Sequence, residues 1–306
     1  MTNKPWPAGL LTALVTPLTD DALDTNVLRI LIDRQIDAGV SGLVVGGGTG
    51  EYGLLTLEER ELLATTAVEA VGGRVPVVLH TGALTTRDAI RLSQQAEQVG
   101  ADGLLVASPY GESINWRERV RFYEDLVAAI SLPIMVYNTP PSGLLTLSEI
   151  QELAELPNIS AVKDSSGSPE LMGDLVEWVE GTDFAVYVGL DSLLYDAVRC
   201  GARGAVFGSA NLIPKPLFAI VRSLLAEGPT PDSAALWREI RPFLRFTERS
   251  PNYMALCKAG LILQGFEVGQ VRAPYLMPDD AEIKELSDRL ASVDRAFGAS
   301  PLAVVQ

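Results

Sequence analysis

Short apolar runs alternate with segments of helical periodicity eight times along the first three quarters of the chain. The apolar runs occupy residues 10–17, 42–46, 75–81, 103–108, 132–138, 159–163, 185–189 and 204–208. They are rich in Val, Leu, Ile and Ala with little polar alternation, which is typical of parallel strands buried on both faces. Eight successive strand–helix units predict an α/β protein with a TIM (β/α)8 barrel. A doubly wound open sheet is the alternative.

The intervening helices and the C-terminal part carry their own signals. Thr56 with Glu59, and Thr146 with Glu149, have the spacing of capping boxes. After Pro214 the pattern is helical only, and a Gly-Pro-Thr-Pro run at 228–231 interrupts it. We therefore expect a barrel at residues 1–227 and a C-terminal helical extension at residues 228–306.

Composition limits the possible partners. The formal net charge of −15 argues against binding to nucleic acid or to anionic membranes, which requires a basic surface. The chain has a single histidine, so a zinc site and other metal sites are not expected. Cys200 and Cys257 lie in apolar helical segments, which predicts two buried, reduced thiols. Residues 1–7 lack a leader pattern and no apolar stretch has membrane-spanning length, so we expect a cytoplasmic protein.

Lys163 is the candidate nucleophile. It follows the apolar run at 159–162 and precedes a polar DSSG run at 164–167, so the stem would lie in an apolar wall and the amine at the mouth of a site. Burial disfavours the ammonium form, and a neutral amine can attack a carbonyl to form a Schiff base. The alternative is an ordinary surface or ion-paired lysine.

Other strand ends carry polar or aromatic groups, and in a barrel these ends meet on one face. The GGGTGE run at 46–51 can turn its N–H groups toward an anion such as a carboxylate, or can form a tight turn only. Tyr137 can place a phenol over the site for proton transfer, or can be a core aromatic. Tyr110 can line the pocket. His80 faces either the pocket or a turn.

In combination these motifs resemble the dihydrodipicolinate synthase / N-acetylneuraminate lyase family of class I aldolase barrels. The resemblance runs from LTALVTP at 11–17 through GGTGE, YNTP at 137–140 and VKDS at 162–165. It continues through GLD at 189–191, GARG at 201–204 and ANLIP at 210–214 to VRAP at 271–274. Several motifs in the same order thus cover nearly the whole chain.

The resemblance implies a chemistry for particular residues. Lys163 would form a Schiff base with pyruvate or another 2-oxo acid, and Tyr137 matches the family's proton-relay tyrosine. Gly48 and Thr49 would hold the carboxylate, and the backbone near Gly189 and Val206 would line the imine side of the pocket. Residues near Ser142 would contact the second substrate. No metal or organic cofactor is implied. The family usually forms tetramers built from dimers, with Tyr110 near the tight dimer contact, so a homo-oligomer, dimer or tetramer, is expected.

Three departures leave the reaction open. The family often has a hydroxyl residue at the position of Gly48, a second relay tyrosine at that of Gly111, and, in the synthases, an arginine after the strand-five tyrosine, where this chain has PPSG at 140–143. Without that fork, bidentate carboxylate binding is lost. Our first interpretation is a Schiff-base lyase of the aldolase type acting on pyruvate or a 2-keto-3-deoxy sugar acid. The alternatives are a dehydratase or deaminase, a synthase-like condensation, or a non-catalytic 2-oxo acid binding protein.

Overall fold

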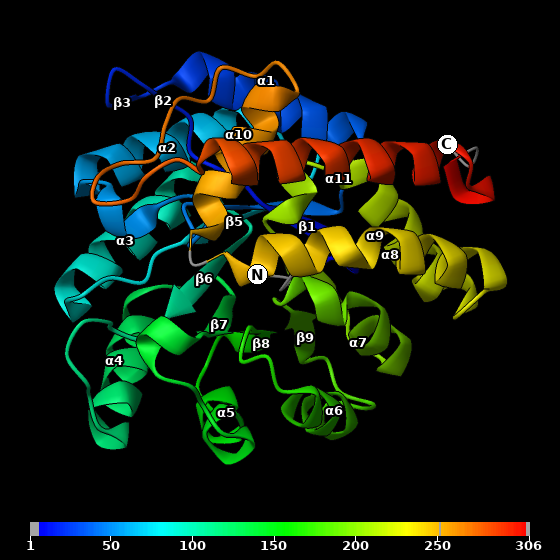
Figure 1. Cartoon of the computed structure of the whole chain (residues 1–306). Coiled ribbons are helices and arrows are strands. Elements are labelled where there is room, and N and C mark those ends of the chain that lie inside the picture. The colour runs from blue at the N-terminus through cyan, green and yellow to red at the C-terminus, as the bar shows by residue number, and fades with distance from the viewer. Residues whose placement is uncertain (1–5, 251, 304–306) are drawn as a thin grey trace.

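The computed structural model describes residues 6–250 and 252–303, and most of the segment 1–7 in which no leader was found lies outside them. Eight parallel strands close into a barrel in the order β1-β10-β9-β8-β7-β6-β5-β4 (Figure 1). The strands are β1 (Gly9–Ala13), β4 (Gly42–Val45), β5 (Val77–His80), β6 (Gly103–Ala107), β7 (Ile134–Asn138), β8 (Ile159–Asp164), β9 (Ala185–Val188) and β10 (Gly204–Phe207). This confirms the TIM barrel and excludes the open sheet.

Helices surround the barrel. They are α1 (Thr25–Asp37), α2 (Leu57–Val71), α3 (Thr86–Val99), α4 (Trp116–Ala129), α5 (Leu147–Ala154), α6 (Pro169–Trp178), α7 (Leu194–Cys200) and α8 (Pro214–Glu227). The predicted capping boxes at Thr56 and Thr146 start α2 and α5. A small hairpin of β2 (Leu18–Thr19) and β3 (Ala22–Leu23), which the sequence did not indicate, precedes α1.

Three further helices follow the barrel: α9 (Pro231–Arg249), α10 (Tyr253–Leu263) and α11 (Asp280–Gly298). In Figure 1 these yellow-to-red helices lie together across one side of the barrel. The expected break is present, since Gly228 ends α8 and Thr230 caps α9. No helix in the described part of the chain is long and apolar enough to cross a membrane.

The barrel interior is filled below the site. Alternate strand residues point inward and form one buried cluster, with Leu11, Val44, Val78, Met135 and Tyr187 among its members. The other strand residues pack against the helices. At the amino ends of the strands, the Trp6 indole donates to Ser160 Oγ at 2.9 Å, and the Tyr187 hydroxyl donates to the Pro7 carbonyl. Access to the barrel axis is therefore through the carboxyl ends.

The cysteine prediction was half right. Both thiols are free, and Cys257 is buried, but Cys200 is exposed. Cys200 is the last residue of the short helix α7, directly before the left-handed cap Gly201, and this position faces outward. The apolar character of the segment comes from Ala197 and Val198, which do pack inward.

Candidate active site

Lys163 and Tyr137 lie side by side at the carboxyl ends of β8 and β7. The strands pair in a register that sets Tyr137 opposite Lys163, and the Lys163 amine lies 4.3 Å from the centre of the Tyr137 ring. Lys163 is only 6% exposed and has no ion-pair partner among the described residues, so the surface and ion-paired alternatives do not hold. β8 extends to Asp164, so Lys163 lies within the strand rather than after it.

The Tyr137 phenol is electrostatically tuned by its neighbours. Burial raises its pKa, but the Lys163 ammonium and the neighbouring hydroxyls of Thr139 and Ser165 outweigh burial, so the net pKa lies below the ordinary value for tyrosine. A phenol that loses its proton more easily than free tyrosine is suited to accepting and returning a proton beside the amine.

Gly189, at the end of β9, forms the other wall beside Lys163. A methyl group built on Gly189 would lie 2.8 Å from Lys163 Cε and 2.1 Å from Ser165 Oγ. Only glycine therefore leaves room for the lysine stem to reach the barrel axis. The lysine amine is held between an aromatic ring on β7 and bare backbone on β9.

The glycine-rich loop after β4 is the predicted anion nest, and it leaves two backbone donors free. Its carbonyls bond back within the loop, with Gly50 and Glu51 N–H donating to the carbonyls of Gly47 and Gly48, each at 3.0 Å. In the described part of the chain, the N–H groups of Gly48 and Thr49 donate to no acceptor, and a methyl built on Gly48 would meet open space. These two N–H groups are available to a carboxylate.

The remaining predicted residues lie at different depths and on different elements around the site. Val206 lies deeper, in the interior cluster, and it is Gly208, two residues on, that approaches the rim, where a methyl would lie 2.7 Å from Thr49 Oγ1. Ser142 lies in the turn Pro140–Ser142 after β7, with a buried hydroxyl that finds no partner among the described residues. Arg119 of α4 donates to the Ser142 carbonyl at 2.9 Å and so supports this turn from behind. The half-buried Tyr110 meets Tyr52 edge-on, with ring centres 5.2 Å apart.

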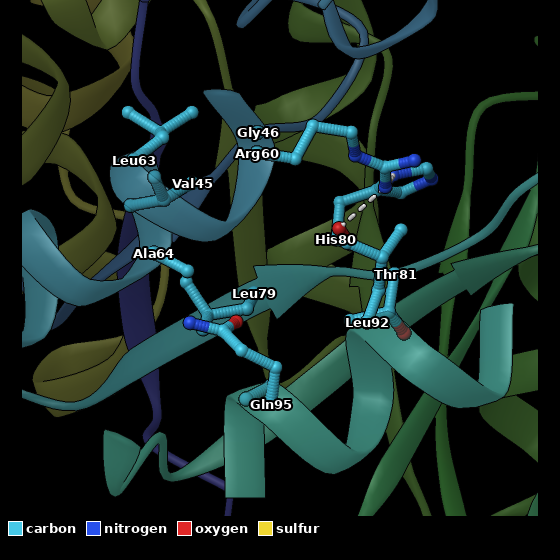
Figure 2. Close-up of a pocket in the computed structure, with 11 residues that line it drawn as sticks. Val45, Gly46, Arg60, Leu63, Ala64, Leu79, His80, Thr81, Leu92 and Gln95 are labelled. Atoms are coloured by element: carbon cyan, nitrogen blue, oxygen red, sulfur yellow. Dashed lines mark hydrogen bonds between the residues drawn. The ribbon is translucent and has the colours of Figure 1, made fainter. Parts of the chain in front are cut away.

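His80 joins the aromatic wall of the site. Its ring centre lies 4.2 Å from that of Tyr52 and 6.5 Å from that of Tyr137. Figure 2 shows the Arg60 guanidinium beside the imidazole, and Arg60 Nη2 donates to the His80 carbonyl at 2.9 Å. Burial, with the positive charges of Arg60 and Lys163, holds the His80 pKa well below its ordinary value. The His80 imidazole is therefore harder to protonate than a free histidine.

The cavity drawn in Figure 2 is not the substrate site. It lies between α2, α3 and the strands β4 and β5, and its volume is about 20 Å³, too small for a 2-oxo acid. The Arg60 side chain is one of the residues that line this cavity. A buried arginine beside the site was not predicted, because nothing in the α2 sequence distinguishes Arg60 from a surface residue.

A second group of titratable residues lies on the opposite side of the site. The Tyr253 hydroxyl, at the start of α10, donates to Asp191 Oδ2 and accepts from Ser209 N–H, both at 2.6 Å. Burial, and then the nearby Glu248, raise the pKa of Asp191 to about 7. The Tyr253 ring also contacts Gly208, since a methyl there would lie 2.4 Å from Tyr253 Cε1. Sequence patterns did not indicate Tyr253, which comes from the extension.

These features define the class. A buried lysine beside a phenol at the open end of a (β/α)8 barrel is the arrangement expected of an aldolase-type lyase, in which an amine and a proton donor act on a carbonyl. Residues 6–293 match the model of the Dihydrodipicolinate synthetase family, and the chain belongs to that family.

Similar proteins agree with this assignment. The chain is 37% identical over 276 residues to 4-hydroxy-tetrahydrodipicolinate synthase 1 of Halalkalibacterium halodurans, covering 89% of this chain and 92% of the relative. It is 31% identical to the 4-hydroxy-tetrahydrodipicolinate synthase of Bacillus subtilis, covering 92% and 98%. Among solved structures, the synthase from Methylacidiphilum fumariolicum SolV has a TM-score of 0.90 at 29% identity, covering 95% and 97%. YagE of E. coli K12, solved in complex with pyruvate, has a TM-score of 0.86 at 29% identity, covering 94% and 98%.

Proposed function

We propose that Lys163 forms a Schiff base with the 2-oxo group of pyruvate or a 2-keto-3-deoxy sugar acid, and that the protein cleaves or forms the adjacent C3–C4 bond. The observation that carries this proposal is the buried Lys163, which lies between Tyr137 and Gly189 and has no ion-pair partner among the residues that the structure describes. The pyruvate complex of the similar YagE supports the substrate class. The N–H groups of Gly48 and Thr49 would bind the substrate carboxylate.

The steps follow from the positions of these groups. The Lys163 amine attacks C2, and Tyr137 protonates the carbinolamine hydroxyl so that it leaves as water. The Tyr137 phenolate left by that step takes the proton of the C4 hydroxyl, and the iminium accepts the electron pair of the C3–C4 bond as the aldehyde departs. Tyr137 then returns this proton to C3 of the enamine. Water releases the product and restores the amine. The iminium is itself the electron sink, so we propose that no metal or organic cofactor takes part.

A second candidate is a synthase-like condensation of bound pyruvate with an aldehyde-bearing second substrate. The names of the relatives favour it. The turn Pro140–Ser142 supplies no guanidinium for a second carboxylate, and Arg119 directs its donors at the backbone behind that turn. Turnover of neutral hydroxyaldehydes with pyruvate, at rates equal to or above those of carboxylate-bearing aldehydes, would favour the sugar-acid assignment. A strong preference for carboxylate-bearing aldehydes would favour the synthase.

We further propose that the enzyme is cytoplasmic and homo-oligomeric, as a dimer or tetramer. The free thiols of Cys200 and Cys257 support a reducing compartment. The exposed Leu84, which lies against Gly111 next to Tyr110, offers apolar surface for a partner subunit. Light scattering of the purified protein would test the assembly.

Trapping the imine tests the central claim. The protein is incubated with pyruvate and borohydride, and intact masses are compared with those of Lys163→Ala treated identically. We expect one reduced pyruvyl adduct on the parent protein and none on the variant. An adduct of equal yield on Lys163→Ala would place the imine elsewhere. The same variant separates an enzyme from a binding protein. An enzyme would lose its turnover in Lys163→Ala, whereas a non-catalytic binding protein would have no turnover to lose and would keep its affinity for the 2-oxo acid.

A further inference from the structure

The anion nest is followed directly by a buried carboxylate. Glu51 ends the glycine-rich run, is 2% exposed, and adopts a left-handed backbone with φ of 60°. Few residues other than glycine adopt this conformation without support from their surroundings. A negative charge buried one turn from the proposed substrate-carboxylate site would by itself repel the substrate.

The C-terminal extension supplies the compensating charge. Lys258 of α10 brings its amine to 2.5 Å from Glu51 Oε1, and both side chains are fully buried. The same amine donates to the Gln270 carbonyl at 2.9 Å, and Arg272 N–H donates to Glu51 Oε2 at 3.1 Å. Glu51 Oε1 therefore has an ion-pair partner and Oε2 a hydrogen-bond donor, both from residues 258–272.

A second set of contacts attaches the same C-terminal segment to the start of α2. Arg272 Nη1 and Nη2 bind the two carboxylate oxygens of Glu59, each at 2.6 Å, and Nη1 also donates to the Leu54 carbonyl at 3.0 Å. Glu59 is the N3 residue of the α2 capping box, whose N-cap is Thr56, and α2 begins just beyond the nest. The loop 46–56 is thus held in its middle, at Glu51, and at its C-terminal end by residues from the extension.

We infer that Lys258 is a positioning residue for substrate binding: it neutralises Glu51 and fixes the loop so that the Gly48 and Thr49 N–H groups bind the substrate carboxylate without repulsion. This inference rests on the proposed function. It gives the extension a role in the site, because a barrel without α10 would carry an uncompensated buried anion behind its anion nest. Breaking a buried ion pair from one side leaves such a charge, whereas removing both partners does not.

Charge-selective variants separate this role from simple support of the fold. In Lys258→Met we expect the KM for pyruvate to rise roughly tenfold, with kcat at saturation changed much less. In the double variant Glu51→Gln/Lys258→Met we expect KM to return near the parent value, because Gln keeps an acceptor for Arg272 N–H and carries no charge. A double variant with the KM of Lys258→Met would overturn the inference, as would an unchanged KM in Lys258→Met.

Two comparisons keep the test decisive. Arg34→Met removes another cation that binds the extension, through Gln264 Oε1 at 2.8 Å, but faces no carboxylate there; it should lower the melting temperature and leave KM unchanged. If Lys258→Met fails to fold, Glu51→Gln is compared with the double variant. The single variant Glu51→Gln keeps the positive charge of Lys258, so its KM for pyruvate should be lower than that of the double variant. Equal KM values in these two would refute the charge effect.

Borohydride trapping at saturating pyruvate distinguishes this inference from the proposed function. If Lys163 is the Schiff-base residue, Lys258→Met still gives the adduct when pyruvate is high, at a raised half-saturating concentration. If the parent protein gives no adduct at any concentration, the proposed function fails first. If the parent protein forms the adduct and the adduct yield of Lys258→Met depends on pyruvate concentration as in the parent, only the role of Lys258 is refuted.

Discussion

At the scale of the residue, the position of the Lys163 side chain depends on the absence of a side chain at Gly189. Gly189→Ala would place a methyl group 2.8 Å from Lys163 Cε and 2.1 Å from Ser165 Oγ, distances that require the lysine to move. We expect the variant to fold but to lose most of its pyruvate adduct. The matched control is Gly173→Ala in α6, where a methyl meets nothing within 4 Å and replacement of a helical glycine adds up to about 1 kcal/mol of stability. Equal adduct yields in both variants would contradict the assigned geometry.

Tyr137 carries the second prediction. If its phenol protonates the carbinolamine, Tyr137→Phe lowers kcat by roughly 10² to 10⁴, the usual contribution of a positioned acid or base. Its pKa in the free protein is below the ordinary value, so the acid form is lost as pH rises and the basic limb of the kcat/KM profile begins below about pH 10. The Phe variant should lack that limb. A pH–rate profile of both proteins checks this, and an unchanged limb would assign it to another group.

Residue positions were predictable where a local pattern marked a strand end, while the catalytic roles of these residues stay predictions. Lys163 and Tyr137 each end an apolar run, and adjacent strand ends must meet. Prediction failed for Arg60 and Tyr253, because their importance comes from contacts with partners 20 and 62 residues away along the chain: His80 and Asp191. Neither has a neighbouring motif, and both lie on helices, where a single polar residue has no distinguishing periodicity.

At the scale of the element, two capping boxes with the same chemistry differ in their surroundings. Glu59 caps α2 and also binds Arg272 through both carboxylate oxygens, whereas Glu149 caps α5 and has no such partner among the described residues. Both predicted boxes formed because Thr-x-x-Glu is a local signal. The link from Glu59 to Arg272 was not predictable, since 213 residues separate the two.

The difference between the boxes is measurable. Glu149→Ala should cost about 0.5–1 kcal/mol of unfolding free energy, the worth of half a cap. Glu59→Ala should cost about 1.5–3 kcal/mol more, because it also removes a charge-assisted pair in which Arg272 is 14% exposed. Urea unfolding of both variants gives the comparison. Equal losses would mean that the Arg272 contact contributes nothing to stability.

At the scale of the whole molecule, the eightfold alternation of apolar runs and helices was sufficient to predict the barrel, since parallel strands of this kind need helices on the outer face. The sequence pattern predicts the helices of the extension at about residues 233–247, 252–264 and 279–297, and each end lies within two residues of the ends of α9, α10 and α11. Their placement over the carboxyl ends of β9 and β10 was not predicted, because nothing in a helix's periodicity says which end of a barrel it covers. That placement brings Tyr253 and Lys258 to the site.

The same placement gives the folded molecule a pH dependence that the sequence does not suggest. Asp191, enclosed by the extension, has a pKa of about 7 against 3.8 in the unfolded chain. Between these values the folded state holds a proton that the unfolded state lacks, so stability falls as pH rises through this window, by at most about 1.4 kcal/mol per pH unit. His80 acts in the opposite direction, because its lowered pKa makes stability fall as pH drops below 6.5.

Asp191→Asn isolates the first of these effects. Asn can still accept the hydrogen bond from the Tyr253 hydroxyl but never becomes an anion, so the variant avoids the cost of ionising a buried acid. We expect the unfolding free energy of the variant minus that of the parent to be larger at pH 8 than at pH 5, by on the order of a few kcal/mol. The contribution of His80 is common to both proteins and cancels in the difference. Urea titrations at the two pH values measure it, and a difference that does not change with pH would show that Asp191 is ionised in the folded protein at both.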